Sequence, residues 1–349
     1  MKRTTLSVFL LAFIVGFVPS ILSEKLSTWR GAVDSNASLL VFGDSSVDAG
    51  NNNGLNTELK VNFPPYGIDF QGHRPTGRFS NGMLATDFIA AAIGQTHAIP
   101  PFLDSKVNQK DLIFGACFAS GGSGYDDLTA NISNVLSLAK QIENFKHYKL
   151  RMMRSYGIIR TKKIIESAIF IISSGSNDFI RNYYLDPTRR TEFTLEKYQI
   201  FLASQMEKYL KRMERLGARR VVVVGLPPFG CLPIVMALSG ASRCVEENNN
   251  VAASFNAIIK RRLLSHRGIE SMYVDTYGIL MNVITNPKSY GIEEVRKGCC
   301  GSGTIEFGNT CKGLNYCIDR SKYVFWDAIH PTEKVYKILA DEVIKSFSK

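Results

Sequence analysis

The sequence predicts an α/β protein in which a mostly parallel central sheet is covered by helices on both faces. Strand-like and helix-like segments alternate along the 349 residues, and several strand candidates are continuously apolar. Strands that are buried on both faces of a sheet have continuously apolar sequences, and the long connections between these strands are typical of crossover helices. We therefore expect a three-layer αβα sandwich.

The first strand candidate begins at Leu39 and stops abruptly at Gly43, Asp44 and Ser45. Each later candidate is likewise a short run of apolar or β-branched residues that ends in turn-forming residues. These later candidates are residues 111–116, 168–173, 219–225, 271–275 and 323–326.

The helix candidates between these strands have apolar residues at helical spacing. They are residues 83–93, 134–156, 195–216, 246–266 and 332–347. Residues 51–81 instead form a long irregular stretch with several aromatic side chains. Loops of this length in a compact domain are usually functional or wrap the surface.

The N-terminus has the layout of a secretory signal peptide. A basic start is followed by an apolar run over residues 6–18 and by small residues at Ser20 and Ser23, so we expect residues 1–23 to be removed. A signal anchor is the alternative, but the apolar run is short for a bilayer span of about 20 residues. Residues 24–349 show no repeat or linker and are expected to form one secreted, extracellular domain.

The cysteines agree with an extracellular location. Six of the seven lie in the second half of the chain, at Cys231, Cys244, Cys299, Cys300, Cys311 and Cys317. Clustered cysteines in a secreted protein predict disulfides, although six of them allow 15 pairings. A zinc site would need paired Cys-x-x-Cys spacing or a nearby histidine, and neither occurs. Cys117 stands apart in an apolar setting and is expected to be buried and unpaired.

Surface chemistry gives weaker signals. The net charge of +11 falls mostly in helix-like segments, where basic residues usually form solvated faces. We expect no nucleic-acid partner, and contact with an acidic cell wall or an anionic lipid surface stays open. Asn36 and Asn131 fit the acceptor pattern for N-glycosylation.

Four polar motifs directly follow predicted strands. They are residues 43–45, 120–122, 175–177 and 327–330. Ligands of an open parallel sheet bind at the carboxyl ends of its strands, so we expect these motifs to meet at one edge.

The first and last of these motifs carry a candidate nucleophile and its base. Ser45 follows a strand, and His330 lies three residues after Asp327 in a turn, where the carboxylate can orient the imidazole toward a serine. The other four histidines lack this setting. Taken alone, Gly-Asp-Ser is also typical of a helix cap, and Asp-x-x-His-Pro of a turn that enters a helix.

The two middle motifs could stabilise an oxyanion. Gly121 and Gly122 allow their backbone N–H groups to approach a ligand closely, and Asn177 offers a side-chain amide. Each motif alone is more typical of an ordinary turn or cap.

All four motifs in this order resemble the blocks of the GDSL esterase/lipase family, also called SGNH hydrolases. The likeness extends from about Leu39 to the closing helix. Further stretches resemble the plant secreted branch in particular, and these are residues 63–67, 77–82, 225–231, 297–301 and 324–331.

The resemblance implies the SGNH hydrolase fold with a flavodoxin-like sheet. It makes Ser45 the nucleophile and an oxyanion donor, His330 the general base and acid, and Asp327 its orienting partner. Asn177 and Gly122 would complete the oxyanion hole. One departure is Cys117, which stands where the family commonly has Asn immediately before Phe-Ala-Ser-Gly-Gly.

The implied reaction is hydrolysis of a small-molecule or lipid ester, either an acyl or an acetyl ester, with no metal and no organic cofactor. Three alternatives remain open. An acyltransferase would use the same triad with an alcohol in place of water. The site of a binuclear metallophosphoesterase would resemble an Asp-x-His motif with further histidine ligands, and no Asp-x-His occurs in this sequence. A non-catalytic coat or binding protein would keep the scaffold alone.

Overall fold

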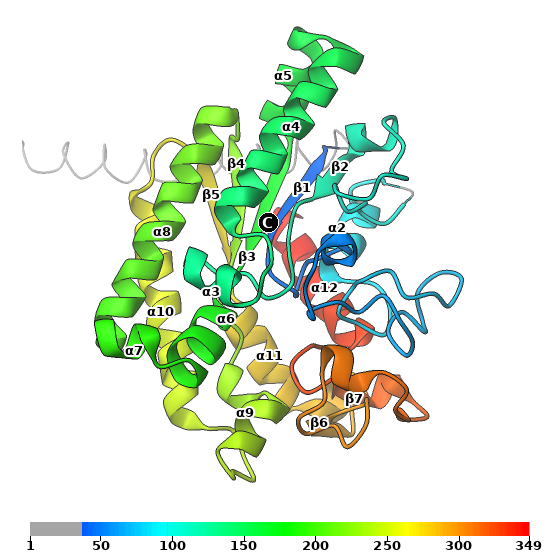
Figure 1. Cartoon of the computed structure of the whole chain (residues 1–349), viewed down its shortest axis with the longest axis vertical. Helices are drawn as coiled ribbons and strands as arrows, with labels where there is room; N and C mark the ends of the chain where they lie inside the picture. The colour runs from blue at the N-terminus through cyan, green and yellow to red at the C-terminus, as the bar shows by residue number, and fades with distance from the viewer. Residues whose placement is uncertain (1–36, 96, 349) are drawn as a thin grey trace, which may run out of the picture.

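Five parallel strands form the centre of the protein (Figure 1). The structure is a computed structural model that describes residues 37–95 and 97–348. The strands lie in the order β2-β1-β3-β4-β5, which is the flavodoxin-like order, so the predicted fold class is confirmed. Their bounds are β1 Leu39–Gly43, β2 Gly115–Cys117, β3 Ile169–Ser173, β4 Arg220–Val224 and β5 Glu270–Val274.

The register aligns the carboxyl ends of the four longer strands. Gly43 pairs with Ser173, Ser173 with Val224, and Val224 with Val274. The segments that follow β1, β3, β4 and β5 therefore leave the sheet at one edge.

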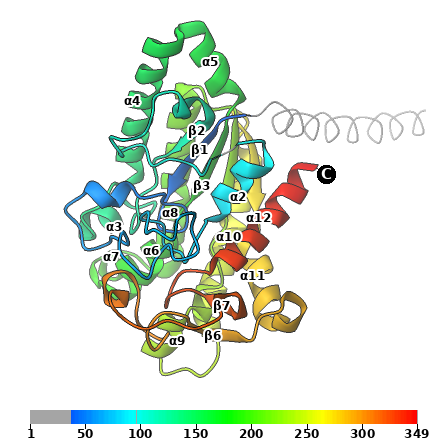
Figure 2. The same ribbon diagram turned by 90° about the vertical axis from the view of Figure 1, so that its right-hand side faces the viewer.

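Helices cover both faces of the sheet, as predicted (Figure 2). Side chains of a strand alternate between faces, so Phe42 and Phe170 pack with α4 (Leu138–Tyr156), α8 (Leu195–Leu216) and α10 (Glu246–Ser265). On the other face, Val41 and Ile171 pack with α2 (Ala85–Ala92) and α12 (Glu333–Ser348).

The remaining helices are shorter and lie mainly in the connections. They are α3 Asp127–Ile132, α5 Ile158–Ser167, α6 Ser176–Phe179, a π-helical turn at Ile180–Leu185, α7 Thr188–Glu192, α9 Pro233–Leu238 and α11 Thr276–Thr285. Several begin at capping side chains: Ser137 caps α4, Thr194 caps α8 and Asp275 caps α11. None of the helices in the described residues combines the length and the apolar composition needed to cross a bilayer.

A small second sheet lies beyond the carboxyl ends of the central strands (Figure 1). It consists of β6 (Glu294–Gly298) and β7 (Tyr323–Phe325), which run parallel. The disulfides Cys299–Cys317 and Cys300–Cys311 lie in the connection between them, and Cys231–Cys244 precedes α10. The predicted disulfide cysteines are thus confirmed, and Cys117 is buried without a disulfide.

Two strand predictions were wrong in part. Residues 111–114 form a 3₁₀ helix, and only Gly115–Cys117 pairs with β1. At Gly115 a Cβ would lie 2.0 Å from the Leu39 carbonyl oxygen, so this close backbone approach needs a glycine. Residues 323–325 do form a strand, but it pairs with β6 and not with the central sheet.

The signal peptide and the two glycosylation sites remain to be considered. The signal peptide and Asn36 lie outside the described residues. Asn131 is exposed near the end of α3, and its glycosylation stays a prediction.

Candidate active site

The candidate nucleophile lies in a turn that the backbone itself shapes. Gly43 ends β1 with φ of 140°, and a Cβ there would lie 1.8 Å from the carbonyl oxygen of Ser173. The next amide, that of Asp44, donates to the same oxygen at 2.9 Å. A glycine is therefore required at this position, and it lets the chain turn and present Ser45 at the edge of the sheet.

One carbonyl joins this turn to two neighbouring segments. The Gly43 oxygen accepts hydrogen bonds from the Ser120 amide at 3.0 Å, the Ser123 hydroxyl at 2.7 Å and the Gln141 side chain at 2.9 Å. Gln141 also accepts from the Gly43 amide at 2.9 Å. This residue of α4 thus holds the turn in place, and the sequence does not predict its role.

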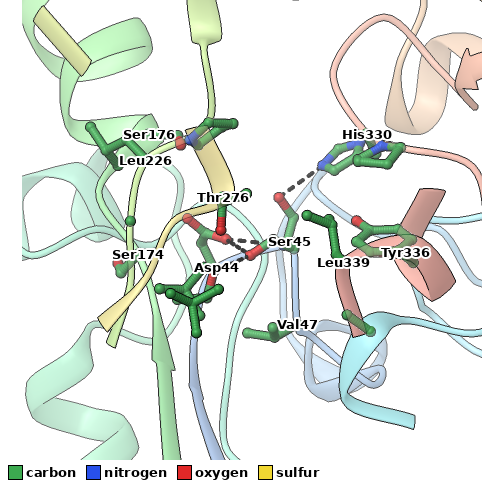
Figure 3. Close-up of a pocket in the computed structure, with 18 of the residues that line it drawn as sticks. Asp44, Ser45, Val47, Ser174, Ser176, Leu226, Thr276, His330, Tyr336 and Leu339 are labelled. Atoms are coloured by element: carbon green, nitrogen blue, oxygen red, sulfur yellow. Dashed lines mark hydrogen bonds between the residues drawn. The ribbon is translucent and has the colours of Figure 1, made fainter. Parts of the chain in front are cut away.

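Ser45, His330 and Asp327 form a continuous chain of hydrogen bonds. The Ser45 Oγ lies 2.8 Å from His330 Nε2 (Figure 3), and His330 Nδ1 lies 2.8 Å from Asp327 Oδ2. Asp327 Oδ1 also accepts from the backbone amides of Ile329 and His330. The carboxylate therefore fixes both the turn and the imidazole ring, and the three predicted residues are brought together.

A buried tyrosine supports the carboxylate from its other side. Tyr66 donates its hydroxyl proton to Asp327 Oδ2 at 2.6 Å and accepts from the Gly308 amide at 2.7 Å. Burial, and next the charge of Asp327, raise the pKa of Tyr66 well above its ordinary value, so it remains a donor. In the sequence, the one indication of a role for Tyr66 is that it is an aromatic residue within the irregular stretch of residues 51–81.

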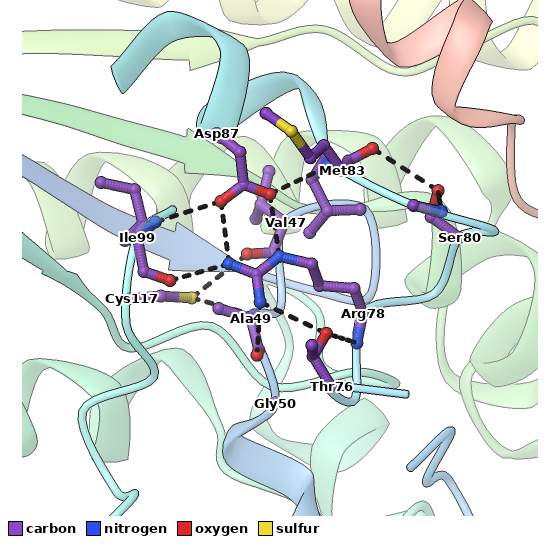
Figure 4. Close-up of polar contacts among 12 residues, drawn as sticks. Val47, Ala49, Gly50, Thr76, Arg78, Ser80, Met83, Asp87, Ile99 and Cys117 are labelled. Atoms are coloured by element: carbon purple, nitrogen blue, oxygen red, sulfur yellow. Dashed lines mark hydrogen bonds and ion pairs between the residues drawn. The ribbon is translucent and has the colours of Figure 1, made fainter. Parts of the chain in front are cut away.

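A buried ion pair anchors the part of that stretch that reaches the histidine. The Arg78 guanidinium binds both carboxylate oxygens of Asp87 at 2.8 Å and the carbonyl oxygens of Ala49 and Ile99 (Figure 4). The next residue, Phe79, has its ring centroid 4.8 Å from that of His330. The pair therefore places an aromatic wall against the imidazole.

The two middle motifs differ in how they lie around Ser45. Asn177 lines the same cavity as Ser45 and His330, and its side-chain amide donates to the Ser123 carbonyl at 3.0 Å. The Gly121 amide donates to Asp48 Oδ2 at 2.9 Å and is thus occupied. Gly122, with φ of 90°, is not among the described residues that line the cavity.

Three buried carboxyl groups surround these segments. Burial raises the pKa of Asp44, which accepts from the Ser46 amide and hydroxyl. Burial also raises the pKa of Asp48 to about 6 and that of Asp178 to about 7. Asp48 accepts from the Gly121 amide, and Asp178 accepts from the amides of Tyr125 and Asp126. Both carboxyl groups therefore fix local backbone geometry.

Cys117 makes contacts at the position where the family commonly has Asn. Its thiol donates to the Val47 carbonyl at 3.1 Å and accepts from the Ala49 amide at 3.4 Å. Burial raises the pKa of this thiol, which keeps it protonated. The cysteine thus anchors the segment that follows Ser45.

Comparisons with known proteins find a matching family model and similar plant proteins. The family described as GDSL-like Lipase/Acylhydrolase matches residues 39–343. The chain is 49% identical over 337 residues to GDSL esterase/lipase At5g45950 of Arabidopsis thaliana, an alignment that covers 95% of this chain and 94% of that relative. It is 46% identical over 312 residues to GDSL esterase/lipase At5g45960 of the same plant, covering 86% and 83%.

Two solved structures are also similar, at low sequence identity. One is the lipase Lip_vut3 from a goat rumen metagenome, with a TM-score of 0.43, 11% identity and coverage of 89% of this chain and 97% of that one. The other is Axe2, an acetylxylan esterase from Geobacillus stearothermophilus, with a TM-score of 0.41, 13% identity and coverage of 89% and 94%.

Proposed function

Since this chain belongs to the family of GDSL-like lipases and acylhydrolases, we propose that it hydrolyses carboxylic esters through a triad of Ser45, His330 and Asp327. The observation that carries the proposal is the unbroken chain of hydrogen bonds from the Ser45 hydroxyl to the buried Asp327 carboxylate. A serine hydroxyl becomes nucleophilic when an oriented imidazole takes its proton.

The steps follow from this arrangement. His330 Nε2 accepts the Ser45 proton while the Ser45 oxygen attacks the ester carbonyl, and the imidazolium formed is stabilised by Asp327. His330 then gives the proton to the leaving alcohol, which leaves an acyl-enzyme. A water molecule, deprotonated by the same imidazole, releases the acid and restores Ser45.

The Ser45 amide and the Asn177 side chain, which both line the cavity, would hold the oxyanion, and the resemblance to the family adds the Gly122 amide. The Asn177 amide has two N–H bonds, and one of them donates to the Ser123 carbonyl, which leaves the second for the oxyanion. Gly122 is preferred over Gly121 because Asp48 already occupies the Gly121 amide. Asn177→Ala is expected to lower kcat by roughly 10²–10³-fold with little change in KM.

We also propose that the chain is secreted after removal of residues 1–23 and works as one domain over residues 24–349, with glycans at Asn36 and Asn131. Three disulfides support this proposal, since they persist in oxidising compartments. The substrate is a small-molecule or lipid ester.

Labelling with a fluorophosphonate tests the triad. The purified protein should form an adduct on Ser45 that disappears in Ser45→Ala and His330→Ala. Ser46→Ala is the matched control and should keep the adduct, because the Ser46 hydroxyl is bound to Asp44 and Ser173 and does not contact His330. If Ser45→Ala forms the adduct in the same yield and on the same peptide as the wild type, Ser45 is not the nucleophile.

A further inference from the structure

An apolar cavity extends inward from Ser45, between the central sheet and helices α2, α11 and α12 (Figure 3). One wall is the sheet face that carries Ile171 and Val222. The opposite wall includes Tyr336, Leu339 and Val343, which lie on one stripe of α12. At 1.5 Å per residue, this stripe extends about 10 Å away from the catalytic histidine.

The polar residues of the lining lie together at the catalytic end, beside apolar residues such as Leu226 and Ile329, whereas the deep end is apolar. The polar members of the lining lie at or just beyond the carboxyl ends of the strands or on the first turns of the helices, and they include Ser174, Asn177, Thr276 and Tyr336. Its deeper members, inside the strands and further along the helices, are apolar: Ile89, Ile171, Val222 and Val343.

Two buried hydroxyls near the catalytic end strengthen this division. The Ser174 and Tyr336 hydroxyl groups have no hydrogen-bond partner within the part of the chain that the structure describes. Buried hydroxyls are normally paired, so this end suits water or the polar part of a ligand. The deep end offers only van der Waals contact. An ester whose carbonyl lies at Ser45 and whose acyl chain points inward matches both ends.

The size of the cavity limits the length of that chain. Its volume is about 140 Å³, and an apolar cavity of about 150 Å³ in another protein holds a benzene ring of six carbons. An acetyl group would leave most of this space empty, whereas a chain of sixteen carbons far exceeds it.

We propose that this cavity binds the acyl chain of the substrate and makes the enzyme selective for esters of aliphatic acids of about six carbons. The proposal rests on the proposed function, because the acyl chain enters from an ester bond held at Ser45. Each methylene buried should raise kcat/KM by about fourfold until the cavity is full.

A series of p-nitrophenyl esters tests the chain-length preference. With acetate, butyrate, hexanoate, octanoate and dodecanoate, kcat/KM should rise to about hexanoate and then level off or fall. Equal values of kcat/KM from acetate to octanoate would overturn the proposal.

Two substitutions on α12 move the limit in opposite directions. Val343→Phe fills the deep end, so the ratio of kcat/KM for hexanoate to that for acetate should fall at least tenfold. Leu339→Ala widens the cavity, so the preferred chain should become longer. Ile344→Phe is the control, since it also places a phenylalanine on α12 but at a neighbouring residue outside the cavity lining, and the ratio should stay within about twofold.

The same samples separate this proposal from the proposed function. Fluorophosphonate labelling of Ser45 shows whether each variant is folded and has an activated serine. Val343→Phe could be labelled like the wild type and keep the wild-type ratio of kcat/KM for hexanoate to that for acetate. In that case the cavity does not bind the acyl chain, and the proposed triad is unaffected. If the wild-type protein hydrolyses no ester and takes no label, both proposals fail.

Discussion

The proposed nucleophile, Ser45, and its proposed base, His330, are held by two regions built in different ways. Ser45 follows a strand of the central sheet, and the Asp44 amide beside it donates to the carbonyl of Ser173 at the end of β3. His330 instead lies in the disulfide lobe, which we define as residues 293–331 and which contains β6, β7 and two disulfides. The first region is fixed mainly by backbone geometry, and the second mainly by side chains.

The carboxylate of Asp327 is the clearest case of this difference. It accepts hydrogen bonds from the Ile329 amide, the His330 amide, the His330 ring and the Tyr66 hydroxyl. The turn before Ser45 depends first on the absence of a side chain at Gly43, and the Gln141 side chain supports it through bonds to the Gly43 amide and carbonyl. Single substitutions that remove bonds to Asp327 should therefore disturb the proposed base more than the proposed nucleophile.

The largest expected effect comes from the centre of the lobe. Asp327→Asn should lower kcat by about 10⁴-fold, because the amide can no longer hold the required tautomer of His330 and stabilise its charged form. Ester turnover under saturating substrate measures this. Asp319→Asn in the same lobe is the matched control, since Asp319 is exposed and only caps a short helix. A loss of less than tenfold in Asp327→Asn would place the orienting role elsewhere.

Disulfide removal compares the lobe with a segment outside it. Cys299–Cys317 and Cys231–Cys244 close loops of similar length, with sequence separations of 18 and 13. Replacing either pair by alanine should lower the free energy of unfolding by about 3 kcal/mol.

The first replacement should reduce kcat more than the second, because the Cys299 and Cys300 amides donate to the carbonyls of Phe325 and Trp326, directly before Asp327. Denaturant unfolding and turnover, measured on both double variants, check this expectation. Equal losses of kcat in the two double variants would show that the lobe gives the histidine no special support.

Tyr66→Phe is expected to have a smaller effect. It removes the hydrogen bond to the charged Asp327 carboxylate, which corresponds to about a tenfold loss of kcat, and it also removes the acceptor of the Gly308 amide. KM should change by less than twofold, since Tyr66 is not among the residues lining the cavity beside Ser45. Steady-state kinetics separate the two constants. Tyr316→Phe, at an exposed tyrosine of the lobe, should behave like the wild type.

The last prediction concerns stability on the sheet side and leaves the catalytic step aside. Asp178 accepts only from neutral groups, namely the Tyr125 and Asp126 amides and the Thr129 hydroxyl. Burial raises its pKa from 3.8 to about 7, so the folded protein binds more protons than the unfolded chain within this window. Its contribution is present below pH 4 and is lost as the pH rises through 7, by at most about 1.4 kcal/mol per pH unit.

Asp178→Asn should remove this component. Urea unfolding at pH 5, 6 and 7 gives the slope of stability against pH for the variant and the wild type, and the other groups contribute equally to both. The slope of the variant should be more positive than that of the wild type. Identical slopes would mean that Asp178 is already ionised in the folded protein at pH 5.

The parts of the site that follow strands were predictable from the sequence. Ser45 comes after an apolar run, and His330 comes three residues after Asp327, so local patterns point to both. The supporting residues were not predictable in this way. Tyr66 is 261 residues from Asp327, and Gln141 is 98 residues from Gly43. Their roles depend on tertiary contacts that neither spacing nor composition reveals.

The errors in the strands have a related cause. Residues 111–116 are apolar enough for a strand, but only the segment from Gly115 comes close enough to β1 to pair with it. Residues 323–325 have strand character that was recognised, yet local sequence does not determine the partner strand. The disulfide-containing connection places them beside β6 instead of the central sheet.

The hydrogen bond between Ser45 and His330 joins positions 285 residues apart in the chain. At the usual elongation rates of about 5–20 residues per second, the ribosome makes the histidine roughly 15–60 s after the serine. During that interval the nascent chain carries the proposed nucleophile without its proposed base. A chain that has not yet reached His330 should therefore not cleave esters through this triad, and α12, which forms a wall of the cavity, is made only after the histidine.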